Sequence, residues 1–185
     1  MSEKYKAFEA DAPYFITFTL VEWLPLFSIP VFAEVIIDSV RYCIANKGLA
    51  VFAYCIMPSH VHMIVQSRKQ PLGAIIRDLK KYTAFRIIEI AEKEQKYNQY
   101  LSVFEEKAGA IKRNKYMKVW QDGFHPEIIF SNTFFFQKLN YIHNNPVVDR
   151  LVAKPEDYLL SSARNYAGLD APIEIVMESQ QLKRY

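Results

Sequence analysis

Two histidines, His60 and His62, are separated by a single residue in an apolar part of the chain. If this part forms a β-strand, side chains two residues apart point to the same side, so both imidazoles face one way. Neutral imidazole is a common ligand of divalent metals, and a strand would hold two of them rigidly. The pair therefore predicts a metal site, although two strand histidines bonded to backbone groups would give the same pattern.

The residues around the histidines predict the strands that such a site needs. Two short apolar runs, 51–57 and 60–66, are separated only by Pro58 and Ser59, a link that allows nothing but an antiparallel hairpin. Aromatic and β-branched residues fill 14–20, which predicts a first strand. A further strand is predicted over 126–131.

Helical periodicity separates these strands. Apolar residues recur at intervals of three and four over 31–47 and again over 71–95, which predicts two amphipathic helices. A third helix is expected to begin at Asn132 as its cap and to stop at Pro146. The order βαββαβα predicts an α+β fold with a ferredoxin-like antiparallel sheet, which carries helices on one face and leaves the other for a ligand or a further helix.

Length and composition favour one domain over 1–185. With 51% hydrophobic residues in 185, the chain can build a single core. We expect a basic, irregular or partly helical insertion at about 97–118 and a C-terminal extension from about 147, with a helix around 156–166.

Cysteine use and hydropathy indicate an intracellular protein. Cys43 and Cys55 form no CxxC pair and lie in apolar stretches, so both are predicted to be reduced and buried. The polar, acidic start resembles no signal peptide, and no run of 18 uncharged apolar residues follows. A soluble, cytoplasmic protein without membrane association is expected.

The net charge of +3 is too small to indicate a nucleic-acid partner by itself. Basic residues do cluster in two places, on the second predicted helix and in the insertion, and they are candidate phosphate contacts. A solvated charged face would explain them equally well. The residues are Arg77, Lys80, Lys81, Lys112, Arg113 and Lys115.

The stretch MPSHVHM from Met57 resembles the metal-binding motif of HUH nucleases, a histidine, a bulky hydrophobic residue and a second histidine at the end of a hairpin. The chain is most similar to the single-tyrosine transposases of this group, especially the REP-associated tyrosine transposases. Further stretches that carry the resemblance are YFITFTLVEWLPLF from Tyr14, VWQDGF from Val119, YIHNNPV from Tyr141 and YLLSSARNY from Tyr158. They follow one another over most of the chain.

The resemblance implies a nucleophile and a third metal ligand. Tyr141 matches the family's catalytic tyrosine, and Asn145 matches the amide residue four positions later that completes the metal site. Four residues make slightly more than one helical turn, so both side chains can share a face. Alternatively, Tyr141 is a packing tyrosine, and Asn145 merely ends a helix before Pro146. Other possible third ligands are His125, His143 and Glu127.

The resemblance also implies the reaction. HUH enzymes use a divalent cation, Mg²⁺ or Mn²⁺, to cleave single-stranded or hairpin-containing DNA. The tyrosine becomes joined to the 5′ phosphate and a free 3′ hydroxyl remains, which can rejoin another strand. The mixed nitrogen and oxygen ligands favour Mn²⁺ over Mg²⁺. Relatives work as monomers or homodimers, and both states stay open.

Two other functions fit parts of the pattern. A ferredoxin-like sheet with exposed aromatic residues can bind nucleic acid without chemistry, although no strand carries the RNA-recognition signature. An HUH replication or mobilisation nickase, or a small metallohydrolase, would keep the two histidines. Covalent capture of DNA through Tyr141 separates these functions.

Overall fold

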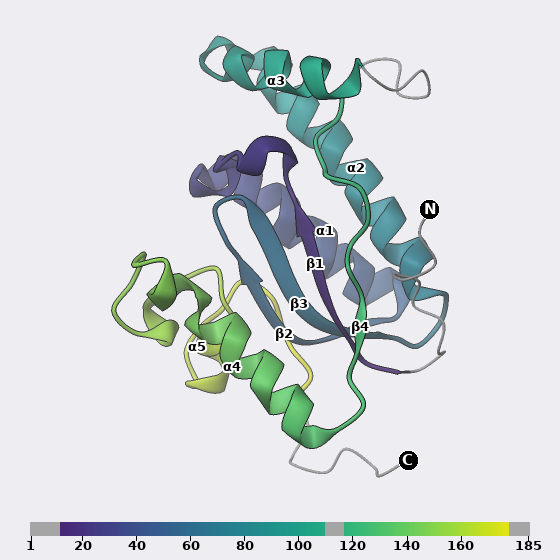
Figure 1. The fold of residues 1–185 in the computed structure, drawn as a ribbon, viewed down its shortest axis with the longest axis vertical. Helices are drawn as coiled ribbons and strands as arrows, with labels where there is room; N and C mark the ends of the chain where they lie inside the picture. The colour runs from purple at the N-terminus through teal and green to yellow at the C-terminus, as the bar shows by residue number, and fades with distance from the viewer. Residues whose placement is uncertain (1–11, 110–116, 178–185) are drawn as a thin grey trace.

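A four-stranded antiparallel sheet forms the centre of the molecule in the computed structural model, which describes residues 12–109 and 117–177 (Figure 1). The strands are β1 (Tyr14–Thr19), β2 (Leu49–Ile56), β3 (His60–Ser67) and the short β4 (Glu127–Ile128). Their order across the sheet is β2-β3-β1-β4. This arrangement confirms the α+β class and the ferredoxin-like order predicted from the sequence.

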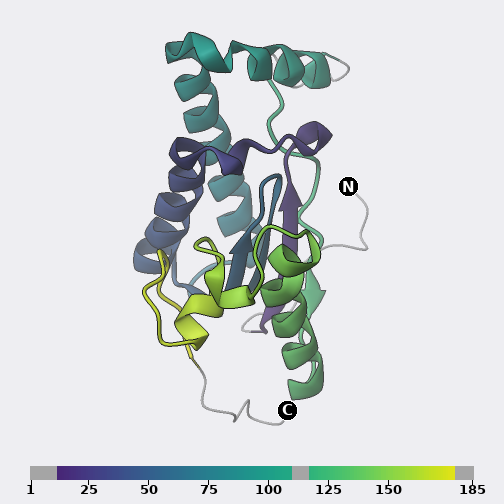
Figure 2. The same cartoon turned by 90° about the vertical axis from the view of Figure 1, so that its left-hand side faces the viewer.

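Helices cover both faces of the sheet, as Figure 2 shows. Helices α1 (Pro30–Lys47) and α2 (Leu72–Lys93) pack against each other on one face, and α4 (Asn132–Val148) lies against β2 and β3 on the other. Helices α1 and α2 are thus the pair predicted on one face, and α4 is the further helix that the prediction allowed on the other. The second face, which the sequence left for a ligand or a further helix, receives both a helix and the histidine pair.

The alternation of strand side chains divides the interior into two cores. From β1, Ile16 and Phe18 join the core beneath α1 and α2. Phe15 points the other way and joins Ile64 and Ile142 in a smaller core beneath α4. Since every second residue of a strand faces the same side, His60 and His62 share the face of Ile64.

Helix α4 differs from its predicted form at both ends. Its cap is Ser131, whose hydroxyl accepts a hydrogen bond from the backbone N–H of Phe134, and not Asn132. The helix also does not stop at Pro146 but continues to Val148. Proline removes only one helical hydrogen bond, and so close to the C-terminus the helix tolerates that loss.

The predicted strand over 126–131 is also shorter in the structure, because only Glu127 and Ile128 pair with β1. Ahead of it runs an irregular segment, residues 117–124, which we call the edge strap. Its carbonyls and amides bond to β1 and the residues that follow it: Thr17 N–H donates to Phe124 at 3.0 Å, and Gln121 N–H donates to Thr19 at 2.8 Å. The edge strap thus extends the sheet without a regular strand.

The first part of the predicted insertion is helical, with a turn at Gln95–Tyr97 followed by α3 (Asn98–Ala108), and residues 110–116 lie outside the described residues. Near the C-terminus, the helix expected around 156–166 is reduced to the turn Pro155–Asp157 and the short α5 (Ala163–Tyr166). Ser161, in this region, forms an isolated antiparallel β-bridge with Cys55 of β2.

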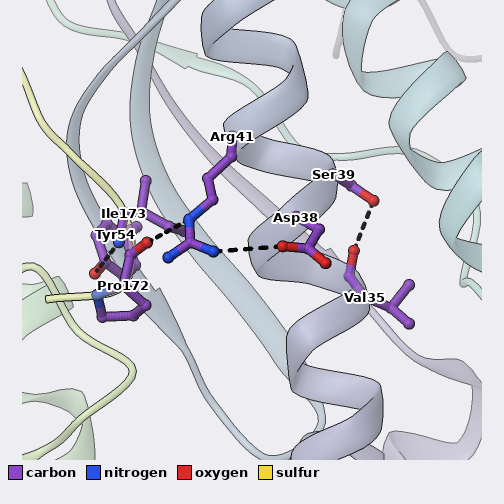
Figure 3. Close-up of polar contacts among 7 residues, drawn as sticks. All are labelled: Val35, Asp38, Ser39, Arg41, Tyr54, Pro172 and Ile173. Carbon is purple, nitrogen blue, oxygen red and sulfur yellow. Dashed lines mark hydrogen bonds and ion pairs between the residues drawn. The ribbon is translucent and has the colours of Figure 1, made fainter.

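The chain after α5 is fastened to α1 and β2 (Figure 3). Arg41 donates to the carbonyl of Pro172 at 2.7 Å and pairs with Asp38, while the N–H of Ile173 donates to the Tyr54 hydroxyl. Burial raises the pKa of Tyr54 to about 12, so the phenol stays neutral and can serve as this acceptor. The C-terminal segment is therefore part of the packed structure.

Cys43 and Cys55 are free thiols and buried, as the sequence predicted. Among the described residues, no helix combines the length and apolar content that a membrane span requires.

Candidate active site

Strand β3 presents two imidazoles toward α4. The rings of His60 and His62 lie 4.6 Å apart between centroids, nearly perpendicular to each other. His62 is only 4% exposed, whereas His60 is partly accessible to solvent. The strand therefore holds one candidate metal ligand, His62, inside the protein and the other, His60, at its surface.

A hydrogen bond from β1 fixes the orientation of His62. Thr17 lies directly opposite His62 in the β1–β3 register, and its Oγ1 is 2.7 Å from Nδ1 of the imidazole. The other ring nitrogen, Nε2, is buried without any hydrogen-bond partner. A buried polar atom without a partner is rare and points to a missing ligand. If Nδ1–H donates to Thr17, Nε2 keeps its lone pair for a metal.

His60 has contacts of its own at the mouth of the site. Its Nδ1 lies 3.1 Å from the Ser59 hydroxyl, and its ring is nearly perpendicular to the Trp23 ring, with the ring centroids 5.4 Å apart. The Nδ1 contact again leaves Nε2 as the nitrogen available to a ligand. Both histidines thus have Nδ1 engaged.

Helix α4 brings Tyr141 to the histidines. The Tyr141 ring lies 5.2 Å from that of His62 and 5.9 Å from that of Phe15, both measured between centroids. Phe15 in turn stacks on His62 at 5.7 Å. Tyr141 is 50% exposed, so it is anchored by one edge while much of the ring stays open.

Asn145 follows Tyr141 on the same face of α4. It is inside the helix, which runs to Val148, and its carbonyl accepts the N–H of Asp149 at 3.0 Å. The alternative that Asn145 is present only to end the helix is thereby weakened. Its role as a ligand stays a prediction.

The electrostatics favour neutral imidazoles. Burial, with smaller contributions from His60 and Lys138, lowers the pKa of His62 to about 3. Burial also lowers the pKa of His60, although Asp149 acts in the opposite direction. Neutral imidazole is the form that binds a metal, so both side chains are ready to do so at neutral pH without losing a proton.

Lys138 lies one turn before Tyr141 and belongs to the surroundings of the site. Its ammonium sits 4.3 Å from the centre of the Phe15 ring and 2.9 Å from a carboxylate oxygen of Glu127. This ion pair occupies Glu127, one of the alternative third ligands. A second alternative, His143, is bonded through Nε2 to Ser162 at 2.9 Å. The last one, His125, adopts a left-handed backbone with φ of 43° just before β4.

The donor set suits one divalent cation of intermediate softness. Within residues 12–109 and 117–177, no group of three or more His, Cys, Asp or Glu side chains could hold a metal. The two imidazoles would therefore need oxygen ligands from Asn145, from Tyr141 or from the substrate. Such an open site leaves room for phosphate.

Of the basic residues predicted to bind DNA, the three that the structure describes are not part of this cluster. Arg77, Lys80 and Lys81 belong to α2, which covers the other face of the sheet, and Lys112, Arg113 and Lys115 lie outside the described residues. Lys80 donates to the carbonyls of Gln121 at 2.8 Å and Gly123 at 2.5 Å. Burial lowers its pKa to about 8. In the structure Lys80 holds the edge strap, and a DNA contact remains a prediction for all six.

Sequence reasoning missed four residues of the site: Thr17, Phe15, Trp23 and Lys138. Only the first two left a signal, since alternation along 14–20 puts positions 15, 17 and 19 on one side of a strand. Their contact with His62 depends on the pairing of β1 with β3, which the sequence did not reveal.

Comparison with known proteins gives three results. A family model described as "Transposase IS200 like" matches residues 26–145, a range that contains both histidines, Tyr141 and Asn145. A structure of a REP-associated tyrosine transposase bound to a REP hairpin covers 97% of this chain and 96% of its own, with 20% identity and a TM-score of 0.62. A structure from Deinococcus radiodurans, provisionally assigned as a transposase, covers 77% of this chain and 97% of its own, with 16% identity and a TM-score of 0.46. Curated protein sequences gave no match.

Proposed function

Because the chain belongs to the IS200-like transposase family, whose members are DNA-cleaving tyrosine enzymes, we propose that Tyr141 cleaves single-stranded DNA in a site shared with His60, His62 and Asn145. The observation that carries this assignment is the position of the Tyr141 ring, 5.2 Å from an imidazole whose buried Nε2 has no partner. The proposed nucleophile thus lies beside an imidazole whose Nε2 could bind a metal.

Cleavage would exchange one phosphodiester for another. The phenol oxygen of Tyr141 attacks phosphorus, a bond forms between them, and the bond from phosphorus to the 3′ oxygen breaks. The phenol loses its proton and the departing 3′ oxygen gains one. The 5′ phosphate stays on Tyr141, and attack by a 3′ hydroxyl reverses the reaction, so no external energy source is needed.

The protein would orient the reacting groups. Phe15 supports Tyr141 by an edge contact and His62 by stacking, which limits the tilt of both rings. A phenol with its ordinary pKa near 10 is mostly protonated at neutral pH. A divalent cation held by His60, His62 and Asn145 would supply the positive charge that favours the phenolate and neutralises the phosphate.

We further propose that the substrate contains a DNA hairpin. A structural relative with the same fold over nearly the whole chain was solved with a REP hairpin. The exposed half of Tyr141 supports access by a strand that is not paired at the cleaved position. The cation in this proposal is Mn²⁺ or Mg²⁺, and Mn²⁺ is expected to bind more tightly.

Covalent capture tests the proposal. The probe is a DNA hairpin with randomised single-stranded flanks, incubated with the protein and Mn²⁺ and then denatured. A fluorophore on the 3′ end should appear on the protein, whereas a fluorophore on the 5′ end should leave with the released fragment. This difference reports the polarity of the bond as well as its existence.

Tyr141→Phe should abolish the labelling and leave Mn²⁺ affinity within about threefold of wild type, because a phenyl ring preserves the packing. Tyr82→Phe is the matched control, since Tyr82 is 52% exposed and Tyr141 50%, and Tyr82 lies on α2. Labelling that persists in Tyr141→Phe, or that never occurs with wild type, would refute the assignment.

A further inference from the structure

An exposed tryptophan stands beside the proposed metal ligand His60. Trp23 is 59% exposed, and its ring lies nearly perpendicular to the imidazole, with the ring centroids 5.4 Å apart. The other tryptophan, Trp120, is 6% exposed, packs on Phe18 and donates its indole N–H to Thr83 at 3.1 Å. The fold thus buries Trp120 in the core and leaves more than half of Trp23 exposed beside His60.

The backbone beneath Trp23 is held in an unfavourable shape. Glu22 and Trp23 have φ values of 51° and 53°, a left-handed conformation that is uncommon for side chains larger than glycine. Two such residues in succession persist only where the surroundings hold them, and they concentrate at functional sites. Burial of the indole does not explain the strain here, because Trp23 stays 59% exposed.

Two backbone hydrogen bonds and one ion pair fix the segment that carries Trp23. Leu20 N–H donates to the carbonyl of Ser59 at 2.9 Å, and Trp23 N–H donates back to Leu20 at 3.2 Å. The Glu22 carboxylate pairs with Lys107 of α3 at 2.9 Å. The indole is therefore presented from a fixed base and not from a free loop, which reduces the entropy lost when a ligand stacks on it.

We propose that Trp23 is a stacking platform for a nucleobase of the DNA strand, next to the phosphate that Tyr141 attacks. This inference rests on the proposed function, since it assumes that a single strand enters the site. Unpaired bases expose flat faces, and stacking on aromatic side chains is a common way to bind them. Because every base has such a face, Trp23 contributes affinity and orientation and does not select a sequence.

Fluorescence quenching tests the contact directly. In a Trp120→Phe background Trp23 is the remaining tryptophan of the two in the sequence. The protein is titrated in EDTA, which prevents cleavage, with a dT 12-mer and with a 12-mer of abasic deoxyribose that has the same charge. Stacking predicts that dT quenches the emission and that the abasic strand does not. Equal quenching by both strands, or none by either, would overturn the proposal.

Ring deletion tests its contribution to affinity. Trp23→Gly removes the indole and accepts the left-handed backbone, so it should unfold at a temperature no lower than wild type while binding dT about tenfold more weakly. Trp23→Phe keeps a smaller ring and should recover most of the affinity. Tyr42→Ala, which removes a 58% exposed ring from α1, should bind as wild type does. Unchanged binding by a folded Trp23→Gly protein would reject the platform.

The two proposals fail in different ways. If wild type is labelled through Tyr141 but Trp23 neither quenches nor affects affinity, the platform is wrong and the enzyme assignment stands. If dT quenches Trp23 but no covalent adduct forms with any hairpin probe, the assigned chemistry is wrong and base stacking stands.

Discussion

Replacing Thr17 with valine should weaken metal binding by His62, although His62 itself is unchanged. The Thr17 hydroxyl is the partner of Nδ1 at 2.7 Å, and His62 is 4% exposed, so water cannot take its place. Valine has nearly the same shape as threonine but cannot accept the imidazole N–H. The variant therefore removes one hydrogen bond and the preference for the tautomer whose Nε2 is free to bind a metal.

The size of the effect follows from burial. A buried donor left without a partner costs about 1–3 kcal/mol, so the free energy of unfolding of the metal-free protein should fall by that amount. Partners that orient metal-binding histidines typically change metal affinity about 10- to 100-fold, which corresponds to about 1.4–2.8 kcal/mol. Mn²⁺ affinity should fall within that range.

Isothermal titration with Mn²⁺ and urea unfolding measure the two effects separately. Thr17→Ser keeps the hydroxyl and should bind Mn²⁺ within about threefold of wild type. Thr19→Val is the matched control, because Thr19 lies on the same strand and the same face but opposite His60. Wild-type Mn²⁺ affinity in a folded Thr17→Val protein would show that Thr17 does not position the ligand.

Three further predictions concern charge, pH and metal. Lys80→Met should lower the free energy of unfolding by about 1 kcal/mol, since it removes two hydrogen bonds, one part-buried and one exposed to solvent. Lys81→Met should change the free energy of unfolding by less than about 0.5 kcal/mol but reduce the salt dependence of DNA binding. Equal unfolding curves for the two variants would contradict the role of Lys80. Burial lowers the pKa values of His62 and His143 to about 3 and about 4. Between these values and pH 6.5 the unfolded chain therefore binds more protons than the folded protein, so the stability of the metal-free protein should fall as the pH drops below 6.5, by up to about 1.4 kcal/mol per pH unit for each histidine. Denaturant midpoints that stay constant from pH 7 to pH 5 would contradict this prediction. Calorimetry should find Mn²⁺ bound more tightly than Mg²⁺, and the reverse order would argue against imidazole ligation.

The histidine pair illustrates what local sequence can predict. Spacing alone placed His60 and His62 on one face of a strand, and the hairpin through Pro58 and Ser59 is present as expected. Strand alternation is a local property with a period of two, so it survives whatever the strand packs against. That Tyr141 lies next to His62 could be expected only from the family resemblance, because their proximity depends on which face of the sheet α4 covers.

Thr17 and the edge strap show what the sequence could not predict. The contact of Thr17 with His62 requires the β1–β3 register, which is set by long-range pairing. The edge strap has no hydrophobic period, because backbone bonds to β1 hold it and its side chains follow no pattern. Lys80 was expected to face solvent, since nothing near it in the sequence indicates the two carbonyls that bury its ammonium.

Helix α4 decides how the proposed site can come apart. Tyr141 and Asn145 lie on one uninterrupted helix that runs from Asn132 to Val148, whereas His60 and His62 belong to strand β3. Any movement of this helix relative to the sheet would therefore withdraw the proposed nucleophile and the proposed amide ligand together. The proposed centre would then be either complete or reduced to its two imidazole nitrogens.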